Sequence, residues 1–250
     1  MAGTTNREKI RTLLKGIETG DPASVLVVNE ARYIQHNPQT EEGSEGLAAL
    51  FKRLSATSPR VEVVRAFEDG DFVFAHTLYD FSRVNVGFEV FRFEDGRAVE
   101  HWDNIQPKRG PNASGRDMLD GQVEIEDVEK TEQNRQRVAG FVSSVLVGND
   151  LSLLPDYVSH DIIEHNPALA DGIDALHSHF SEQPGINYET THRVLAEGNF
   201  VLTQSEGHRG GIRTAFYDLF RLVGGVIVEH WDTTEAIAPV DQWKNDNGKF

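Results

Sequence analysis

Apolar residues recur at helical spacing near the start of each half of the chain and alternate with polar residues later in each half. The first helical stretch follows Thr5-x-x-Glu8, a capping-box pattern in which each side chain can bond the backbone N–H of the other residue. Intervals of three and four residues place the apolar positions on one face of a helix. These positions are Ile10, Leu13, Leu14 and Ile17 in the first half, and Val138, Phe141, Val142 and Val145 in the second. Both halves are therefore expected to begin with an amphipathic helix.

Two further helices and four strands are predicted in each half. The helices are expected over residues 23–30, 45–54, 151–157 and 174–180. Alternation predicts the strands, and Gly-containing turns separate them. The strands are expected over residues 61–67, 72–81, 88–93 and 98–105, and again over 188–196, 200–206, 214–222 and 226–233. Helices followed by an antiparallel meander indicate the α+β class, with the helices on one face of each sheet.

The same peptides occur twice at one offset, which indicates a duplicated domain. Glu-His-Trp-Asp at Glu100–Asp103 returns at Glu229–Asp232, 129 residues later (229 minus 100). His-Asn-Pro at His36–Pro38 returns at the same offset, at His165–Pro167. A repeat of this length is much longer than the units of stacked repeat proteins, so it predicts two globular domains.

The predicted domains cover residues 1–110 and 129–250, and each is long enough to bury its own core. Residues 111–128, with their proline, glycines and acidic side chains, are expected to form a linker or an extended arm on the first domain. The polar residues from 239 to 250 are expected to be loosely ordered.

Composition limits the partners and the chemistry. The 250-residue chain has no cysteine, which excludes disulfides and thiolate catalysis. Its formal net charge of −16 argues against nucleic acid or an anionic membrane as a partner. The N-terminus has no apolar run typical of a signal peptide, and no segment is long and apolar enough to span a bilayer. We therefore expect a cytoplasmic protein whose partner is a small molecule.

Acidic residues and a histidine share one face of two neighbouring predicted strands. Alternation places His101 and Asp103 on one face, and Glu89 of the preceding strand can lie across from them. Burial and a second carboxylate raise a carboxyl pKa toward neutral pH, which suits general acid–base catalysis. The alternative is a solvated sheet face on which these residues have no chemical role. The corresponding residues of the second half are His230, Asp232 and Asp218.

His36 and Asn37 precede a proline, which favours an extended turn. They are expected at the mouth of a pocket, where they supply a hydrogen-bond donor and an acid–base imidazole. The alternative is a turn in which Asn37 bonds its own backbone. His165 and Asn166 are the equivalent pair of the second half.

His76 alternates with phenylalanines in a predicted strand, so it is either a core histidine or a pocket residue. We assign no metal ligands. The alternative is a set of two histidines and one carboxylate, formed by His36, His101 and Asp103.

The order of these motifs resembles the SnoaL-like polyketide cyclase family of the nuclear-transport-factor-like superfamily. The resemblance rests on the His-Asn-Pro turn, the strand meander and Phe-Arg-x-x-x-Gly-x-x-x-Glu-His-Trp-Asp, and it covers about 5–107 and 132–237. It implies a cone-shaped domain made of a curved antiparallel sheet and about three helices. Two such domains in tandem are expected to pack as an intramolecular pseudo-dimer, and further assembly into homo-oligomers is left open.

In cyclases of that family, the aspartate that closes the motif is the acid–base residue of an intramolecular aldol closure. The resemblance therefore implies that Asp103 and Asp232 are catalytic, with His101 and His230 beside them. The expected substrate-binding residues are His36, Asn37, His76, Glu89, Trp102, His165, Asn166, Asp218 and Trp231.

The expected function is cofactor-independent acid–base catalysis, of the aldol cyclase, lyase or isomerase kind, on a small and largely apolar carbonyl compound. The aspartate would remove a proton α to the carbonyl, and His101 or His36 would bond the developing enolate oxygen. One alternative is a non-catalytic protein that binds a small hydrophobic ligand. Another is an epoxide or ester hydrolase in which the same aspartate activates water.

Overall fold

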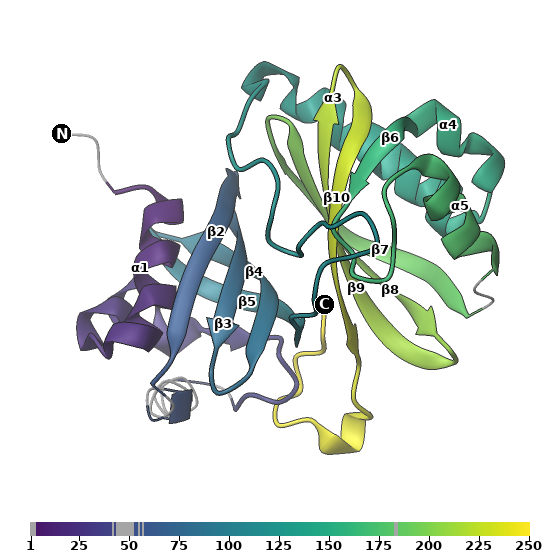
Figure 1. The fold of residues 1–250 in the computed structure, drawn as a ribbon. Coiled ribbons are helices and arrows are strands. Elements are labelled where there is room, and N and C mark those ends of the chain that lie inside the picture. The colour runs from purple at the N-terminus through teal and green to yellow at the C-terminus, as the bar shows by residue number, and fades with distance from the viewer. Residues whose placement is uncertain (1–3, 42, 44–52, 55, 57, 183–184) are drawn as a thin grey trace. The chain divides into compact units, whose positions relative to one another are not determined.

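The chain forms two compact units (Figure 1). The computed structural model describes residues 4–41, 43, 53–54, 56, 58–182 and 185–250. The first unit comprises Met1–Pro107 and Ala238–Phe250, and the second comprises Lys108–Ile237. The expected linker therefore groups with the second unit. The C-terminal tail, Ala238–Phe250, groups with the first unit instead of the second.

In the described part of the first unit, a helix and short 3₁₀ turns come before the strands of the sheet. The helix is α1 (Asn6–Thr19), and the 3₁₀ turns cover Pro22–Val27 and Glu30–Arg32. The strands are β1 (Ile34–Gln35), β2 (Arg60–Asp69), β3 (Phe72–Asp80), β4 (Val84–Glu94) and β5 (Arg97–Pro107). The helix expected over residues 45–54 lies outside the described residues except at 53 and 54, which are helical.

The second unit repeats this order. Its helices are α3 (Thr131–Phe141), which continues as π-helical turns over Val142–Val147, α4 (Leu154–Tyr157) and α5 (Ile173–Glu182), with 3₁₀ turns over Val128–Lys130 and Leu151–Leu153. Its strands are β6 (Val158–Glu164), β7 (Ile186–Glu197), β8 (Phe200–Arg209), β9 (Ile212–Val223) and β10 (Val226–Ala236). The tail contains one more 3₁₀ turn, Val240–Gln242.

Each unit contains one five-stranded mixed sheet, which confirms the α+β class and the tandem duplication. The strand orders are β1-β5-β4-β3-β2 and β6-β10-β9-β8-β7. The four long strands of each sheet form the expected antiparallel meander. The edge strands β1 and β6 were not expected, and they pair in parallel with β5 and β10. Their sequences lack a clear alternation, because β1 is only two residues long and β6 contains three adjacent polar residues.

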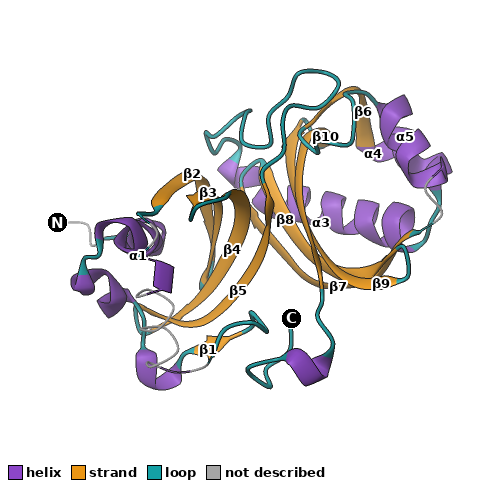
Figure 2. Ribbon diagram, turned by 60° about the horizontal axis from the view of Figure 1, so that its bottom comes forward, coloured by secondary structure: helices purple, strands orange, loops and turns teal. Residues whose placement is uncertain are grey.

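The first helix forms for the reasons that its sequence predicts. Thr5 Oγ1 accepts a hydrogen bond from Glu8 N at 3.2 Å, and Thr5 N donates to Glu8 Oε2 at 2.8 Å. At the other end, Gly20 adopts a φ of 68°, a left-handed conformation that costs glycine little. The apolar face of α1 packs against β2 and β3, and α3 packs in the same way against β7 and β8 (Figure 2).

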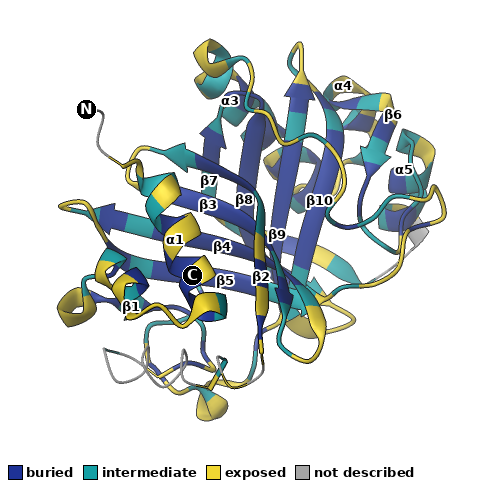
Figure 3. Cartoon of the chain, turned by 60° about the vertical axis from the view of Figure 1, so that its left-hand side comes forward, coloured by how far each residue is buried: buried dark blue, intermediate teal, exposed yellow. Residues whose placement is uncertain are grey.

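Both faces of each sheet are buried, and they have different surroundings. On the face toward the helices, here called the helix face, Val73 and Ala75 join a core cluster with residues of α1. The opposite face carries Phe74 and Phe88, which are also fully buried. The central strands of the second unit are similarly buried along most of their length (Figure 3). None of the helices in the described part of the chain is long and apolar enough to cross a membrane.

Candidate functional site

The first unit encloses a cavity of about 450 Å³ between its helices and the helix face of its sheet. Its apolar wall includes Leu13, Leu14 and Ile17 of α1, Phe91 of β4 and Ile105 of β5. The polar side chains in the wall include Gln35, Asn37, Glu89, His101 and Asp103. A mostly apolar cavity with a few convergent polar groups is typical of a small-molecule site.

His101 is held between two oxygen atoms of different chemical kinds. Its Nδ1 lies 3.0 Å from Gln35 Oε1, and its Nε2 lies 2.6 Å from Glu89 Oε2. The backbone N–H of Asn37 also donates to Gln35 Oε1, at 2.9 Å, which identifies this atom as the amide oxygen. His101 Nδ1 must therefore be the donor to Gln35. One further proton is shared between His101 Nε2 and the Glu89 carboxyl group.

Asp103 faces the cavity with one oxygen atom engaged and one available. Its Oδ2 accepts a hydrogen bond from Asn37 Nδ2 at 2.8 Å. Its Oδ1 is buried and has no hydrogen-bond partner among the described residues. Asp103 lies directly across from Glu89 in the β4–β5 pair, so two carboxyl groups share this end of the cavity.

Burial determines the protonation of the groups around this pair. Burial raises the pKa of Glu89, and the nearby Asp103 raises it further, although hydrogen bonds from His101 and Tyr79 oppose the change. Tyr79 donates to Glu89 Oε1 at 2.9 Å. Burial also raises the pKa of Tyr79 and of Tyr33 well above the usual value, with added repulsion from Glu89 and Asp103. Both tyrosines therefore keep their protons, and Tyr79 uses its proton to bond Glu89.

The second unit has the same framework with a different charge. His230 lies between Glu164 at Nδ1 (2.9 Å) and Asp218 at Nε2 (3.2 Å), so a carboxylate replaces the amide of Gln35. Burial opposes a charge on His230, but Glu164 and Asp218 outweigh burial and raise its pKa well above the usual value. Asn166 Nδ2 donates to Asp232 Oδ2 at 2.8 Å, as Asn37 does to Asp103. Burial raises the pKa of Asp232 to about 7.

The two units differ most in the space beside these residues. Two cavities at the equivalent place in the second unit have volumes of about 20 and 30 Å³. Register explains the difference: Gly87 pairs with Ile105 across β4 and β5, and Phe216 pairs with Thr234 at the equivalent positions of β9 and β10. Phe216 stacks on Tyr188 with ring centroids 4.3 Å apart, and these two rings fill the volume that is open in the first unit.

A tyrosine bonds the site carboxylate in both units, although it comes from different strands. In the first unit it is Tyr79 of β3, which pairs with Val61. In the second unit it is Tyr188 of β7, which pairs with Gly207 and lies 3.2 Å from both carboxylate oxygens of Asp218. A tyrosine on β3 in the first unit, and one on β7 in the second, thus give the same contact from different places in the sheet.

His36 and Trp102, both expected to bind substrate, do not line the cavity. They lie on the opposite face of the sheet, where their rings stack with centroids 4.6 Å apart. His36 Nδ1 donates to the carbonyl of Gly248 at 3.0 Å, and its Nε2 lies 2.9 Å from Glu100 Oε1. Arg92 Nε donates to the other oxygen of Glu100 at 2.6 Å. The expectation that His36 supplies an imidazole to the pocket is wrong, because alternation turns Glu100 and Trp102 away from Asp103 and His36 packs on them.

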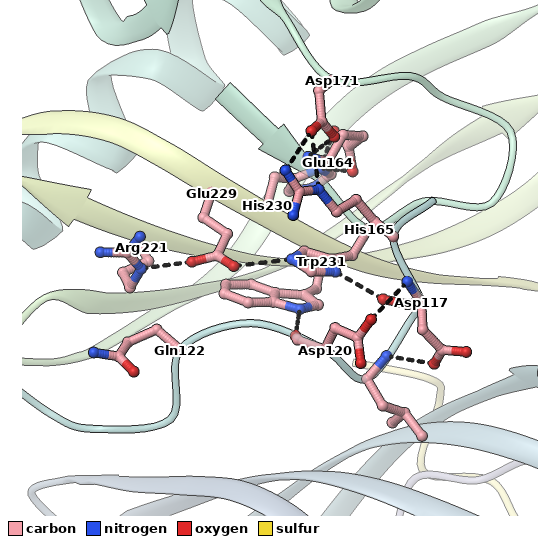
Figure 4. Close-up of polar contacts among 12 residues, drawn as sticks. Asp117, Asp120, Gln122, Glu164, His165, Asp171, Arg221, Glu229, His230 and Trp231 are labelled. Carbon is pink, nitrogen blue, oxygen red and sulfur yellow. Dashed lines mark hydrogen bonds and ion pairs between the residues drawn. The ribbon is translucent and has the colours of Figure 1, made fainter. Parts of the chain in front are cut away.

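The second unit repeats this arrangement around Glu229 (Figure 4). Glu229 lies between His165 Nε2 at 2.9 Å and Arg221 Nε at 2.6 Å. His165 stacks on Trp231 with centroids 4.7 Å apart. Here the segment Lys108–Asp127, which we call the arm, replaces the tail: His165 Nδ1 donates to the carbonyl of Asp117 at 2.7 Å.

The arm also approaches Trp231, whose Nε1 donates to the carbonyl of Asp120 at 2.9 Å. Gly121 follows with a φ of 96°, and a Cβ atom there would lie 2.1 Å from Glu229 Oε1 and 2.7 Å from Trp231 Cζ2. In each repeated motif, the side chains on the face opposite the helices therefore bind an extended segment of the chain. Only the side chains on the helix face are directed toward a cavity.

His76 is also outside the cavity. It is fully buried on the opposite face of β3, with Nδ1 2.6 Å from Arg65 Nη1 and its ring edge against Phe88. Its counterpart Gln204 lies 3.3 Å from Arg193. The core alternative considered for His76 therefore describes its position.

Tyr33, which lines the cavity, was not predicted from the sequence, nor were Gln35, Tyr79 and Lys249. Gln35 lies two residues before Asn37, and its position before the His-Asn-Pro turn is the only signal that it gave. Tyr79 alternates with Thr77 toward the helix face, a signal that it shares with Val73 and Ala75 of the same strand. Lys249 lies in the tail, where nothing in the local sequence indicates a role.

The structure also tests which residues could bind a metal ion. Ligand atoms of Glu89, His101 and Asp103 lie within 4.8 Å of one another, and all three residues are buried. His36, the third member of the set considered from the sequence, is on the other face of the sheet. The close contact of His101 with Glu89 is already satisfied by the proton that they share, so we assign no metal ligands.

Comparisons with known proteins identify the family of the chain. The SnoaL-like domain model matches residues 10–101 and 138–230. A proposed ketosteroid isomerase from Kribbella flavida has a similar fold, with 22% identity and a TM-score of 0.40, over 44% of this chain and 84% of that one.

Two further solved structures are similar at the same level. An LEH-like epoxide hydrolase from M. tuberculosis has 21% identity and a TM-score of 0.36, over 42% of this chain and 85% of that one. IdmH from Streptomyces antibioticus, a proposed polyketide cyclase, has 18% identity and a TM-score of 0.37, over 41% of this chain and 92% of that one. No curated protein matches the chain in sequence. Because the family model matches both halves and more than half of all residues, the chain belongs to the SnoaL-like domain family, of which it contains two copies.

Proposed function

We propose that the first unit is a cofactor-independent acid–base enzyme that removes a proton α to the carbonyl of a small, largely apolar compound. The observation that carries the proposal is Asp103, which lines the cavity of about 450 Å³ and whose buried Oδ1 has no hydrogen-bond partner among the described residues. A base must reach the proton that it removes, and the available oxygen of Asp103 does so for a ligand in this cavity.

The structure supports a different oxyanion donor from the histidines considered above. Both ring nitrogens of His101 are engaged, by Gln35 and by Glu89. Tyr33 lines the same cavity, and its hydroxyl forms no hydrogen bond with any described residue. Its raised pKa keeps the hydroxyl proton in place, and Glu89 and Asp103 both act on that pKa, so the hydroxyl is near the acidic end of the cavity. We assign Tyr33 as the donor to the enolate oxygen, which is the charge that forms in the transition state.

The step balances in protons and electrons. The α C–H bond breaks, its proton goes to Asp103 Oδ1, and its electron pair forms the C=C bond of an enolate whose oxygen accepts a hydrogen bond from Tyr33. The enolate carbon then either attacks a second carbonyl, as in an aldol closure, or takes a proton back at the same or a conjugated position. Asp103 returns the proton to the product, so no cofactor or co-reactant is consumed.

The proposal assigns this activity to the first unit alone. Asp232 and His230 have the corresponding positions in the second unit, but Phe216 and Tyr188 occupy the space that a ligand would need. The position of Tyr33 is taken there by Ile162, which has no donor. The second unit thus retains the polar framework as part of its core.

Exchange of α-hydrogens for deuterium tests the proposal without a known substrate. The protein is incubated in D₂O with a panel of apolar ketones, such as 1-tetralone and 2-decalone, and exchange is followed by NMR. We expect catalysed exchange of at least one member, and a loss of about 100-fold or more in Asp103→Asn, because a positioned general base contributes about that much.

The other outcomes identify the alternatives. Ketone binding without exchange, unchanged in Asp103→Asn, would indicate a non-catalytic binding protein. Hydrolysis of an epoxide or ester panel that requires Asp103, without any ketone exchange, would indicate a hydrolase in which the same aspartate activates water. Undiminished ketone exchange in a folded Asp103→Asn variant would overturn the proposed mechanism.

A further inference from the structure

We infer that Lys249, the penultimate residue of the chain, is a positioning residue for Asp103, so that the C-terminal tail completes the site of the first unit. The inference deepens the proposed function and rests on it. Lys249 Nζ donates to the carbonyl oxygen of Asp103 at 2.7 Å and lies 3.6 Å from Asp103 Oδ1. The lysine side chain is only 2% exposed, and that of Asp103 is 7% exposed.

The tail is bonded along the same segment that carries Asn37, the hydrogen-bond donor to Asp103. Asn245 Nδ2 donates to the carbonyls of Asn37 at 2.8 Å and Thr40 at 2.9 Å. Asn247 Nδ2 donates to the carbonyl of Gln35 at 3.1 Å. The carbonyl of Gly248 accepts from His36, as described above. The last six residues are therefore held at several points, and Lys249 reaches Asp103 from a fixed backbone.

A buried ammonium group needs a nearby anion, because taking an isolated charge out of water is costly. Asp103 supplies that anion, and its backbone carbonyl takes one of the three N–H donors of the lysine. In return, the cation attracts the carboxylate of Asp103 and fixes its orientation. The other titratable groups that line the cavity with Asp103 are Glu89, His101, Tyr33 and Tyr79, together with Arg53 and Lys244.

Among the described residues, Lys249 is the cation within ion-pair distance of the Asp103 carboxylate, with Nζ 3.6 Å from Oδ1. Without it, Asp103 and the Glu89 pair would compete for that proton within a low-dielectric space. With it, Asp103 is held as the base, and Oδ1 is left without a hydrogen-bond donor and available for the substrate.

The second unit is a natural comparison within the same chain. The groups that act on the pKa of Asp232 are His230, Glu164, Asp218 and Asn166, and none of these described residues is a lysine. The arm reaches this unit through the carbonyls of Asp117 and Asp120, which bond His165 and Trp231. A segment docks on both units. The tail brings Lys249 to Asp103 in the unit with the open cavity, whereas the arm's described contacts with His165 and Trp231 are made by backbone carbonyls.

Two readouts test the role of Lys249. The first is the pH profile of ketone exchange in wild type, Lys249→Met and Lys249→Arg. Methionine keeps much of the apolar stem and removes the charge, whereas arginine keeps the charge. We expect the acid limb of the profile to shift in Lys249→Met, because the variant removes a positive charge that lies 3.6 Å from the proposed base. Lys249→Arg should restore most of the shift, and Asp246→Asn, at an exposed tail position, should leave the profile unchanged.

The second readout needs no activity. In a double-variant cycle with Asp103→Asn, the loss in urea midpoint caused by Lys249→Met should fall by at least half when Asp103 is already neutral. If Lys249→Met does not fold, Lys249→Gln replaces it, since glutamine retains a donor for the Asp103 carbonyl without a charge. Additive midpoints together with an unchanged pH profile would overturn the inference. Coupled midpoints in a protein that exchanges no ketone would support the ion pair and contradict the proposed function instead.

Discussion

Phe216 occupies in the second unit the position that Gly87 occupies in the first, and this one exchange largely decides which unit has a cavity. Gly87 and Phe216 lie on β4 and β9, and each of these strands is directly beside the strand that carries the site aspartate. At Gly87, an added Cβ atom would lie 2.7 Å from Thr77 Oγ1 and 2.8 Å from Tyr79 Cε2. The glycine therefore allows Tyr79 to bond Glu89 while the adjacent space stays open.

Gly87→Ala should consequently destabilise the first unit. The added methyl group forces Tyr79 or Thr77 to move within a packed region, and overpacking of this kind costs about 1–3 kcal/mol. Urea denaturation measures the change in the free energy of unfolding. Gly110→Ala is the matched control, since no atom lies within 4 Å of its added Cβ. Equal stability of the two variants would contradict the role given to Gly87.

Asp232 should make the stability of the protein fall as pH rises. Burial raises its folded-state pKa to about 7, whereas an aspartate in an unfolded chain ionises at about 3.9. Between these values the folded state binds more protons than the unfolded state, so the free energy of unfolding decreases with increasing pH. Asp232→Asn should remove this dependence and stabilise the protein at pH 8, by an amount whose ceiling is on the order of 4 kcal/mol.

Chemical denaturation at pH 5 and pH 8 measures that difference. Asp241→Asn, at an exposed position of the tail, is the control and should follow the wild type at both values. A variant Asp232→Asn that loses stability at pH 8 would show that the carboxylate is needed in its ionised form.

Glu229 should stabilise the second unit through its ion pairs. Burial raises its pKa, but the hydrogen bonds from His165 and Arg221 outweigh burial and lower it overall, so this stabilisation is present above the usual glutamate value and lost as pH falls. Glu229→Gln leaves Arg221 and His165 without their charge partner, at a cost of about 3 kcal/mol near pH 7. Glu124→Gln, at an exposed position of the arm, should change little when measured beside it by thermal or urea unfolding. A cost of Glu229→Gln that is the same at pH 3 and pH 7 would contradict an ionic origin.

Much of the fold could be predicted from spacing alone. The repeat at 129 residues identified two domains, and the change from helical to alternating spacing identified their class. The same alternation placed Glu89, His101 and Asp103 on one sheet face, because side chains of a strand alternate and neighbouring strands stand in register.

The rest depends on contacts that local pattern does not contain. His36 and Trp102 belong to the same repeated peptides as Asn37 and Asp103, yet they lie on the other face of the sheet, where their rings stack and His36 bonds the tail. The recurrence of a peptide therefore did not show which of its side chains face the cavity and which face the other side of the sheet. The different cavities depend on cross-strand pairs such as Tyr188 with Gly207, and Lys249 reaches Asp103 from 146 residues away in the chain.

The comparison of Asp103→Asn with Asp232→Asn tests the central claim most directly. Both variants replace a carboxylate with an amide at equivalent positions of the two units. One position is beside the open cavity, and the other is beside the filled site. Deuterium exchange into a ketone should fall by about 100-fold or more in Asp103→Asn and stay within about twofold of wild type in Asp232→Asn. The reverse result, with exchange lost in Asp232→Asn and retained in Asp103→Asn, would contradict the assignment of catalysis to the first unit.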